Sequence, residues 1–388
     1  MKLAQTALML SCLTAHAGEP AYTVHDLGAI GIEAEAHAIN NSGVIVGLSY
    51  DTIAAHLSVR FEDPSPVPLL IPSALQQMQA VGITDAGFIA TMAFSLNDLG
   101  ADAVITADGL PPIDIAGFIP RGIDAQGRLV GARPVLTVDN MYTERAAWWD
   151  GAARIDLPAL AGSAWSIAHD IDPAGRIIGS AIPQGAMRPR AVLWDGAAID
   201  LGTLGGATAQ ALAINGNSEI VGVAETASGK PHAFLFRVNG QSVSERLDLG
   251  FLGGNASAAY DINDNGQVVG ASFGHAFLWE QGAMLDLNEA LVDPDGWVLE
   301  TATAINAAGT IVGHGVHAPY GRRAFVLVPV AACTADLNGD GILDLGDIQA
   351  FVVAFVAGDP LADLAAPFGV LDLADISVFV GAFVAGCG

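Results

Sequence analysis

A short pattern of apolar and polar positions recurs along most of the chain. Its consensus is I-[ND]-x-x-G-x-[IVL]-[IV]-G, and successive copies follow one another at intervals of 40 to 48 residues, with imperfect second and fifth copies. The copies begin at Ile39, Ile83, Ile123, Ile171, Ile214, Ile262 and Ile305. Self-similarity at such a period indicates a repeat architecture rather than several unrelated domains.

Each copy predicts four short strands. The first ends in Ala-x-x-Ile-Asn and leads into a turn, where Asn or Asp caps the start and Gly takes the left-handed conformation. The Val-Ile-Val-Gly part is the second strand. The third is clearest in HAFLF at His232 and HAFLW at His275, and the fourth carries an Asp-Leu pair such as Asp200-Leu201. Four strands in about 44 residues is the size of a β-propeller blade.

The two ends of the repeat array predict how the ring closes. The seventh copy ends at its third strand, AFVLVPV, and lacks an Asp-Leu strand, whereas residues 22–28, YTVHDLG, supply one at the other end. We therefore expect an all-β fold within residues 18–330, a seven-bladed β-propeller of four-stranded blades whose last blade is completed by the first strand. A β-solenoid or an open array of sandwiches is the alternative.

Composition and charge narrow the classes of function. The 388 residues are 52% hydrophobic, include 46 glycines and are only 14% charged, which is typical of a globular chain with many turns. The formal net charge is −26, and such a surface repels phosphate backbones, so we expect no nucleic-acid partner. An acidic surface suits divalent cations or a salty environment, and charge alone does not choose between them.

The N-terminus has the pattern of a secretory signal. Lys2 precedes an apolar stretch, and Ala15-His16-Ala17 forms a small-x-small cleavage site, so residues 1–17 are expected to be removed on export. A lipobox around Cys12 is the alternative interpretation. No later apolar run reaches the ~18 residues of a membrane helix, so no transmembrane segment is expected. In an exported protein, Cys333 and Cys387 are expected to form a disulfide.

A duplicated segment follows Val330. LDLGDIQAFVVAFVAG starts at Leu343 and LDLADISVFVGAFVAG at Leu371, a spacing of 28 residues. Apolar residues recur at helical spacing after each Asp-Ile, which predicts two short amphipathic helices packed together. Residues 331–388 are therefore expected to form a small α-helical, EF-hand-like module of their own.

An EF-hand-like loop, DLNGDGILDLGD, precedes the first of these helices. Ca²⁺ binds six to eight oxygens, and the loop offers an oxygen at every ligand position, with Gly341 at the sharp turn. The expected ligands are Asp336, Asn338, Asp340, the carbonyl of Ile342, Asp344 and Asp347. A polar turn without a metal is the alternative. The second loop is degenerate because apolar residues replace its middle oxygens, and its possible ligands are Asp363, Asp372 and Asp375.

A calcium-loop lookalike lies in the sixth repeat, YDINDNGQVVGAS. Asp261, Asn263 and Asn265 alternate before Gly266, as at the start of an EF-hand loop. The twelfth position, however, is Ser272, and the positions of Asp261 and Asn265 vary among the other copies. Only the capping Asn or Asp and the turn Gly persist, which indicates a hairpin rather than a metal site.

The repeats resemble the HAF family of extracellular repeats, through the His-Ala-Phe strands at His232 and His275 and D-L-G-x-L-G-G at Asp200 and Asp248. This resemblance implies secretion and a β-rich repeat fold, without a defined reaction. The C-terminal module resembles a dockerin, in the variant called GC-type dockerin, through its duplicated loops, Cys333 and the terminal Gly386-Cys387.

The dockerin resemblance implies an exported bacterial protein, extracellular or at the cell surface, that attaches to a cohesin-like partner, often in polysaccharide-degrading assemblies. One departure concerns loop positions 10 and 11, where familiar dockerins often carry Ser-Thr. Here they hold Leu345-Gly346 and Leu373-Ala374. Another surface-anchoring protein is therefore the alternative partner.

No catalytic residue is expected in the propeller. His232 and His275 occupy a repeated position that is Arg190 or Arg323 in sister copies, which favours a structural role. The sequence contains no G-x-S-x-G elbow, no HExxH and no phosphate-binding glycine loop. The rival interpretation is a propeller-type glycoside hydrolase or lyase, or an accessory subunit, of an extracellular polysaccharide-degrading assembly. It requires carboxylates unique to single blades at the ring centre, within the ~5–10 Å that glycosidases use.

A binding face is the expected function of the propeller. The loops between second and third strands vary most in length and hold seven of the chain's 15 Lys and Arg residues, together with Tyr142 and Tyr320. The seven are Arg133, Arg145, Arg188, Arg190, Lys230, Arg322 and Arg323. In a closed ring they share one face, which predicts an acidic polysaccharide or acidic protein as ligand. Ordinary solvated loop arginines are the alternative.

Overall fold

The chain divides into two compact units, Tyr22–Val328 and a second that contains the C-terminal helices. The computed structural model describes residues 20–52, 55–62, 66–69, 75–95, 101–136, 142–330, 335–338, 343–364 and 370–385. The predicted signal segment and five other residues with a predicted role therefore lie outside the described residues, namely Cys333, Asp340, Gly341, Ile342 and Cys387.

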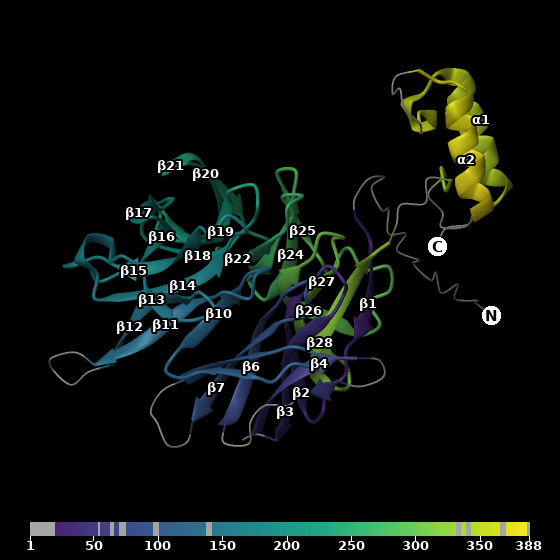
Figure 1. Ribbon diagram of the computed structural model, residues 1–388. Helices are drawn as coiled ribbons and strands as arrows, with labels where there is room; N and C mark the ends of the chain where they lie inside the picture. The colour runs from purple at the N-terminus through teal and green to yellow at the C-terminus, as the bar shows by residue number, and fades with distance from the viewer. Residues whose placement is uncertain are drawn as a thin grey trace, which may run out of the picture. The chain divides into compact units, whose positions relative to one another are not determined.

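The first unit consists, in its described residues, of seven four-stranded sheets (Figure 1). Strands that follow one another in the chain pair antiparallel within each sheet. We number the sheets as blades 1 to 7, beginning with the sheet that contains β2.

The bounds of the strands follow the repeats. Blade 1 comprises β2 (Glu33–Ile39), β3 (Ile45–Thr52), β4 (Ala55–Phe61) and β5 (Val67–Pro68). Blade 2 comprises β6 (Leu75–Ile83), β7 (Ile89–Ser95), β8 (Ala101–Thr106) and β9 (Ile113–Ile115). Blade 3 comprises β10 (Ile119–Ile123), β11 (Leu129–Leu136), β12 (Tyr142–Trp149) and β13 (Arg154–Asp156). Blade 4 comprises β14 (Trp165–Ile171), β15 (Ile177–Ile182), β16 (Arg190–Asp195) and β17 (Ala197–Gly202), preceded by a 3₁₀ turn at Leu160–Gly162.

The remaining blades complete the ring. Blade 5 comprises β18 (Gly205–Ile214), β19 (Glu219–Thr226), β20 (Pro231–Asn239) and β21 (Ser242–Gly250). Blade 6 comprises β22 (Ser257–Ile262), β23 (Val268–Ser272), β24 (His275–Glu280) and β25 (Ala283–Asp286). Blade 7 comprises β26 (Trp297–Ile305), β27 (Ile311–His317), β28 (Gly321–Pro329) and, as its outermost strand, β1 (Tyr22–Asp26).

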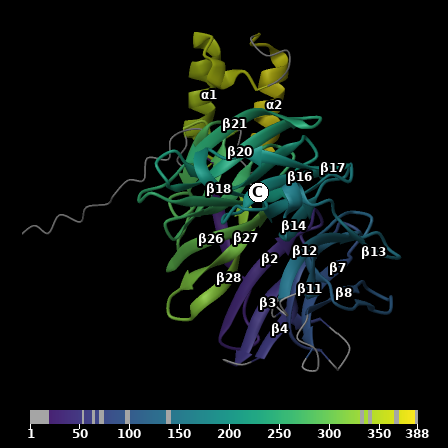
Figure 2. The same ribbon diagram turned by 90° about the vertical axis from the view of Figure 1, so that its left-hand side faces the viewer.

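Ring closure joins the first strand to the last blade, as predicted. β1 pairs with β28, and the backbone N–H of Leu27 donates to the carbonyl oxygen of Ala324 at 3.0 Å. The first strands of adjacent blades contact one another around the ring, β26 against β2 included. In Figure 2, the inner strands β2 and β14 lie nearer the centre than the outer strands β13 and β17. The expected seven-bladed β-propeller is thus confirmed.

Each innermost strand contains a β-bulge at the same position. In blade 6, Ala259 pairs with Gly270 and Asp261 pairs with Val269, so Tyr260 between them has no partner on the second strand. A bulge redirects the extra side chain and disrupts the local ladder. The bulged residues of blades 1 to 7 are His37, Val81, Arg121, His169, Leu212, Tyr260 and Thr303.

The last Gly of the repeat is explained by the backbone next to this bulge. A Cβ atom on Gly270 would lie 2.0 Å from the carbonyl oxygen of Ala258, a distance that no side chain tolerates. The turn Gly has the predicted left-handed conformation, with φ of 80° at Gly43. In the imperfect fifth copy, Ser218 adopts the same conformation, with φ of 69°.

A separate apolar core fills each of the interfaces between adjacent blades. The Phe of the third strand contributes to three of them, because Phe234, Phe277 and Phe325 are completely buried. Burial of one such side chain stabilises the fold by roughly 1.5–3 kcal/mol. The repeated His-Ala-Phe and Arg-Ala-Phe strands therefore reflect packing between blades.

The second unit contains the two expected helices, α1 (Leu345–Ala357) and α2 (Leu373–Ala385), with a 3₁₀ turn at Pro360–Ala362. Phe351 and Phe379 occupy equivalent positions of the duplication, and their rings stack at a centroid distance of 4.2 Å. They form the centre of a small apolar core. Among the described residues, no helix is both long and apolar enough to cross a membrane.

Candidate functional site in the central channel

The bulged side chains converge on the axis of the propeller. All seven line one cavity of about 230 Å³, together with the residue that follows each of them. A single residue position, repeated in each blade, therefore determines the chemistry of the channel at this level. The residues at this position belong to six types, whereas the Ile that lies two residues further on is the same in every blade.

Arg121 carries the positive charge of this cavity. Its side chain is exposed, and no carboxylate forms an ion pair with it among the residues that the structure describes. His169 of the next blade lies near it. Burial, with a further contribution from the charge of Arg121, lowers the pKa of His169 to about 4, so this imidazole is neutral at physiological pH.

Two carboxyl groups that are not shared by all repeats also line the cavity. Asp170 accepts hydrogen bonds from the backbone N–H of Ile171 and, across the blade interface, from that of Ile214, at 2.8 and 2.9 Å. Asp261 is held in the same way by Ile262 and by Ile305 of blade 7, both at 2.8 Å. Both side chains therefore connect neighbouring innermost strands.

The surroundings of these carboxyl groups perturb their protonation. Although part of each side chain faces the channel, burial inside the propeller raises the pKa of Asp170 to about 7 and that of Asp261 to about 6. The hydrogen bonds from backbone N–H groups lower both values and only partly offset burial. Asp170 and Asp261 thus present less negative charge to the channel than two ordinary aspartates.

A polar cluster lies beside the channel where blades 7 and 1 meet. Arg322 contacts Glu35 at 3.3 Å and Glu300 at 3.4 Å, while His37 contacts Glu35 at 3.5 Å. The hydrogen bond from His37 lowers the pKa of Glu35. Burial lowers the pKa of His314, whose buried Nδ1 has no hydrogen-bond partner in the described residues. This cluster combines acceptors and donors without a large net charge.

The other mouth of the channel is formed by the turns of the repeat. These turns surround a second cavity of about 290 Å³. The side-chain amide of Asn263 donates to the carbonyl oxygen of Asn306 at 3.0 Å, and that of Asn306 donates to Asn40 at 3.3 Å, which links blades 6, 7 and 1. In blades 3 and 4 the capping residue is Asp124 or Asp172, and each pairs with an Arg four residues later.

The calcium-loop lookalike is part of these contacts between blades. Asp261 accepts from Ile305, Asn263 donates to Asn306, and Asn265 donates to the carbonyl oxygen of Ala307. The sequence indicated only a hairpin here. The structure adds that each of the three polar side chains of this motif holds the following blade.

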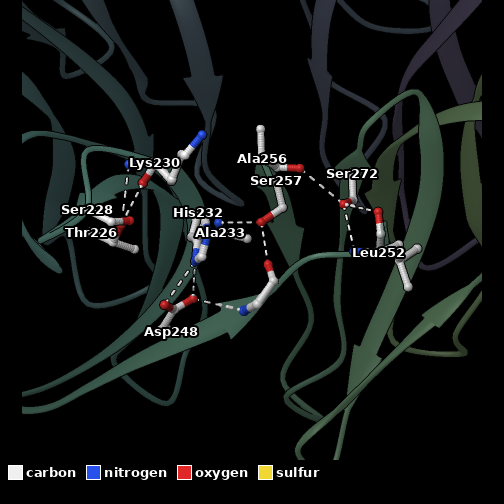
Figure 3. Close-up of polar contacts among 11 residues, drawn as sticks. Thr226, Ser228, Lys230, His232, Ala233, Asp248, Leu252, Ala256, Ser257 and Ser272 are labelled. Atoms are coloured by element: carbon white, nitrogen blue, oxygen red, sulfur yellow. Dashed lines mark hydrogen bonds and ion pairs between the residues drawn. The ribbon is translucent and has the colours of Figure 1, made fainter. Parts of the chain in front are cut away.

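The repeated His or Arg of the third strand pairs with the Asp of the fourth. Figure 3 shows His232 directed at Asp248, with both carboxylate oxygens 2.9 Å from Nδ1, and Asp248 also accepts from the backbone N–H of Gly250. The same clasp joins His275 to Asp286 and Arg190 to Asp200. These contacts hold the fourth strand of a blade against the third strand of the same blade.

The expectation that the seven predicted binding residues lie in loops is wrong for five of them, because only Arg188 and Lys230 lie between the second and third strands and the others lie within strands. Most of the seven already have acidic partners. Arg188 and Arg190 line a surface cavity of about 380 Å³. Ion pairs join five of the seven to carboxylates: Arg133 to Asp156, Arg188 to Glu225, Arg190 to Asp200, Arg322 to Glu35 and Glu300, and Arg323 to Asp26. Arg145 has a buried Nε without a hydrogen-bond partner, and Lys230 has no ion pair among the described residues.

In the second unit, two equivalent aspartates lie fully buried at the start of the helices. Asp347 accepts hydrogen bonds from the backbone N–H of Asn338 and Asp344, at 3.2 and 3.0 Å. Asp375 accepts from Leu364 and Asp372, at 2.7 and 2.8 Å. Each carboxylate thus connects the beginning and the end of its loop.

The described part of the first loop is rich in oxygen atoms that could coordinate a metal ion. Burial opposes ionisation of Asp347, yet hydrogen bonds from Asp344, Asn338 and the side chain of Asp336 lower its pKa. Among the described residues, no group of three His, Cys, Asp or Glu side chains is arranged to hold a metal ion. Two of the six predicted ligands lie outside those residues.

No family model and no curated protein matches the sequence. Several solved structures are similar in fold. The β-propeller domain of the Trilobed protease from Pyrococcus furiosus has 10% identity and a TM-score of 0.48, over 80% of this chain and 97% of that domain. TolB from Acinetobacter baumannii has 12% identity and a TM-score of 0.43, over 77% of this chain and 64% of TolB. Pyrococcus horikoshii acylaminoacyl peptidase has 13% identity and a TM-score of 0.45, over 78% of this chain and 52% of the peptidase.

Proposed function

We propose that the protein is a secreted binding protein with two working parts. The propeller, non-catalytic in this proposal, presents a ligand site in its central channel. The C-terminal helix pair, ordered by Ca²⁺, attaches the protein to a surface-anchoring partner of the cohesin kind. The signal-like N-terminus, the HAF-like repeats and the dockerin-like duplication support this assignment.

The observation that carries the anchoring role is an apolar stripe repeated on the two helices. Leu345 and Leu373 are 76% and 74% exposed, and Val356 and Val384 are 82% and 80% exposed. Each pair is 28 residues apart, the period of the duplication. Exposed apolar side chains that recur at equivalent positions of both helices favour an interaction surface. The duplication therefore offers a partner two equivalent faces.

The residues of the first loop fit Ca²⁺ by their chemistry. The donors are carboxylate, amide and carbonyl oxygens, the ligand types that Ca²⁺ prefers. Asp336 and Asp347 interact directly through their side chains, so two acidic groups share a small volume. When bound, Ca²⁺ would supply the positive charge that offsets them. Asp347 would then keep its present task of joining the loop to the first turn of α1.

Calorimetric titration of the full chain with CaCl₂ tests this proposal. We expect binding to the wild type, and at least a tenfold loss of affinity in Asp347→Asn. Asp359→Asn is the matched control, because Asp359 lies outside both loops and its Asn keeps the acceptor for the backbone N–H of Leu361. A wild type that binds no Ca²⁺, or equal affinity in Asp347→Asn, contradicts the anchoring role.

A second candidate function is the cleavage of an acidic polysaccharide in the channel. The observation in its favour is the raised pKa of Asp170, because a general acid works best with a pKa near the operating pH. Against it, both oxygens of Asp170 already accept backbone hydrogen bonds. Release of reducing ends from polygalacturonate by the wild type, abolished in Asp170→Asn, would favour this alternative.

A further inference from the structure

The bulged position of the innermost strand is free of the constraints that fix its neighbours. The residue two positions later is always Ile and lines the channel mouth. The last position of the repeat is Gly in six of the seven blades, where an added Cβ would meet the backbone. The bulged side chain instead points into the cavity and varies from blade to blade. A position that is structurally fixed but chemically varied is what a ligand site needs.

Three of the bulged residues offer polar groups to the cavity. These are Arg121, His169 and Tyr260, and none of them has a side-chain hydrogen bond or ion pair to another described residue. The hydroxyl of Thr303 and the ring of His37 are engaged, by the carbonyl oxygens of Ala36 and Ala80 respectively. The three available groups come from blades 3, 4 and 6, so they approach the cavity from different sides.

The charge and size of the cavity define the ligand class. A guanidinium group presents a planar pair of donors that matches a carboxylate. The neutral imidazole of His169 and the phenol of Tyr260 suit hydroxyl groups, which both donate and accept. Val81 and Leu212 add apolar contacts. At about 230 Å³ the cavity is smaller than the ~300–1,000 Å³ of typical drug-sized sites, so it suits one sugar residue or a small organic acid.

The acidic residues in the channel do not prevent the binding of an anion. Asp170 and Asp261 direct their oxygens at backbone N–H groups of their own and the following blade. Neither forms an ion pair with Arg121. The guanidinium group therefore remains available.

We propose that the central channel binds the carboxylate of a sugar acid, with Arg121 pairing with the carboxylate and with His169 and Tyr260 contacting the sugar hydroxyls. The inference rests on the proposed role of the propeller as a ligand-binding domain and names its ligand class. The sugar acid can be free or the end of an acidic polysaccharide, since both present the same group.

Isothermal titration of the full chain with glucuronate tests the proposal, with glucose as the neutral probe and acetate as the anion without a sugar. We expect glucuronate to bind more tightly than acetate, and glucose to show no measurable binding. Arg121→Gln should weaken glucuronate binding at least tenfold, and Arg121→Lys by less. Arg154→Gln, at a surface cavity on the outermost strand of the same blade, is the matched control and should bind glucuronate like the wild type.

The possible outcomes separate this inference from the function on which it rests. Equal glucuronate affinity in Arg121→Gln and the wild type, at unchanged melting temperature, overturns the proposal, as does a wild type that binds neither glucuronate nor acetate. Binding of a galacturonate trimer at its end would identify a polysaccharide as the source, and binding of monomers alone would identify a free acid. Loss of Ca²⁺ binding with intact glucuronate binding would refute the anchor and leave the channel site standing.

Discussion

Arg323 on β28 forms an ion pair with Asp26 on β1, with its Nε atom 3.2 Å from Oδ2 of Asp26. The two residues are 297 positions apart in the chain. Asp26 also accepts from the backbone N–H of Gly28 at 2.8 Å. Internal blades use the same clasp between strands that adjoin in sequence, so a contact inherited with the repeat closes the ring.

Asp26→Ala should destabilise the propeller more than the equivalent change within a blade. Hydrogen bonds to charged groups contribute about 1.5–3 kcal/mol, and here they hold a strand that lacks a hairpin connection to its neighbour. Asp200→Ala is the control, because the short turn between β16 and β17 keeps those strands adjacent. Urea denaturation of both variants provides the comparison. Equal losses of unfolding free energy would show that the clasp has no special role in closure.

Asn306→Asp should lower the free energy of unfolding by about 1–3 kcal/mol. The substitution keeps the side-chain oxygen that accepts from Ala308 and Thr310 but removes the N–H that donates to Asn40. It isolates the bond between blades 7 and 1.

A second substitution should rescue this variant. Blade 4 carries Asp172 at the equivalent position, paired with Arg176 four residues later. Thr310→Arg in the Asn306→Asp background supplies the same pair and should restore part of the stability, as followed by thermal unfolding. Absence of any rescue would mean that the Asp–Arg pair does not substitute for the ring of Asn contacts.

Asp170 should make the propeller less stable as the pH rises from about 4 to 7. Its pKa in the folded state, about 7, lies above the ordinary value of 3.8, so the folded state binds the proton more tightly. That stabilisation is complete below the ordinary pKa and is lost as the pH rises through the folded value. Asp170→Asn removes this dependence. The stability of the wild type relative to Asp170→Asn should therefore be larger at pH 4 than at pH 7.5, as measured by calorimetry.

Because the exposed apolar residues are duplicated on α1 and α2, we expect either helix alone to be sufficient for partner binding. Val356→Asp or Val384→Asp alone should leave binding to a panel of purified cohesin domains within a few-fold of the wild type. The double variant should abolish it, because both apolar faces then carry a charge. Calcium binding by the first loop should not change in any of the three, since each residue lies at the end of its helix opposite to the loop that precedes that helix. Full binding by the double variant would place the partner surface elsewhere.

The strands and the blade number of the propeller could be predicted from the sequence, because seven copies of one pattern show the strand positions more clearly than any single copy does. The position of Asp-Leu at residues 26–27 was enough to predict the closing strand. The bulge was missed, although it has a signal. The buried Ala259 and Ile262 are three residues apart, and strict alternation along a strand allows only even spacings.

The hydrogen bonds between blades could not be predicted from the sequence, because they join residues about one repeat apart and no local pattern identifies the partners. Asn263 is at a turn-capping position, and no neighbouring residue indicates that its side chain donates to the carbonyl oxygen of Asn306. The partners of the predicted binding arginines were equally hidden, since Arg133 lies on β11 and Asp156 on β13, with β12 between them. The residues that line the channel differ among blades, so a comparison of the repeats for conserved positions does not identify them.

Each repeat consists of a largely constant framework and one variable position, the bulged residue of the innermost strand. Ile is the same in every copy, and Asn or Asp and Gly recur in most copies. The bulged residue is His, Val, Arg, His, Leu, Tyr and Thr in blades 1 to 7. None of these residues has a partner in the ladder of its own blade. His37 and Thr303 do bond to carbonyl oxygens of neighbouring blades, so the other five positions are the ones that can vary without loss of a hydrogen bond. If the channel binds a ligand as proposed, its specificity would be changed by substitutions at these five positions, which leave the contacts between blades intact.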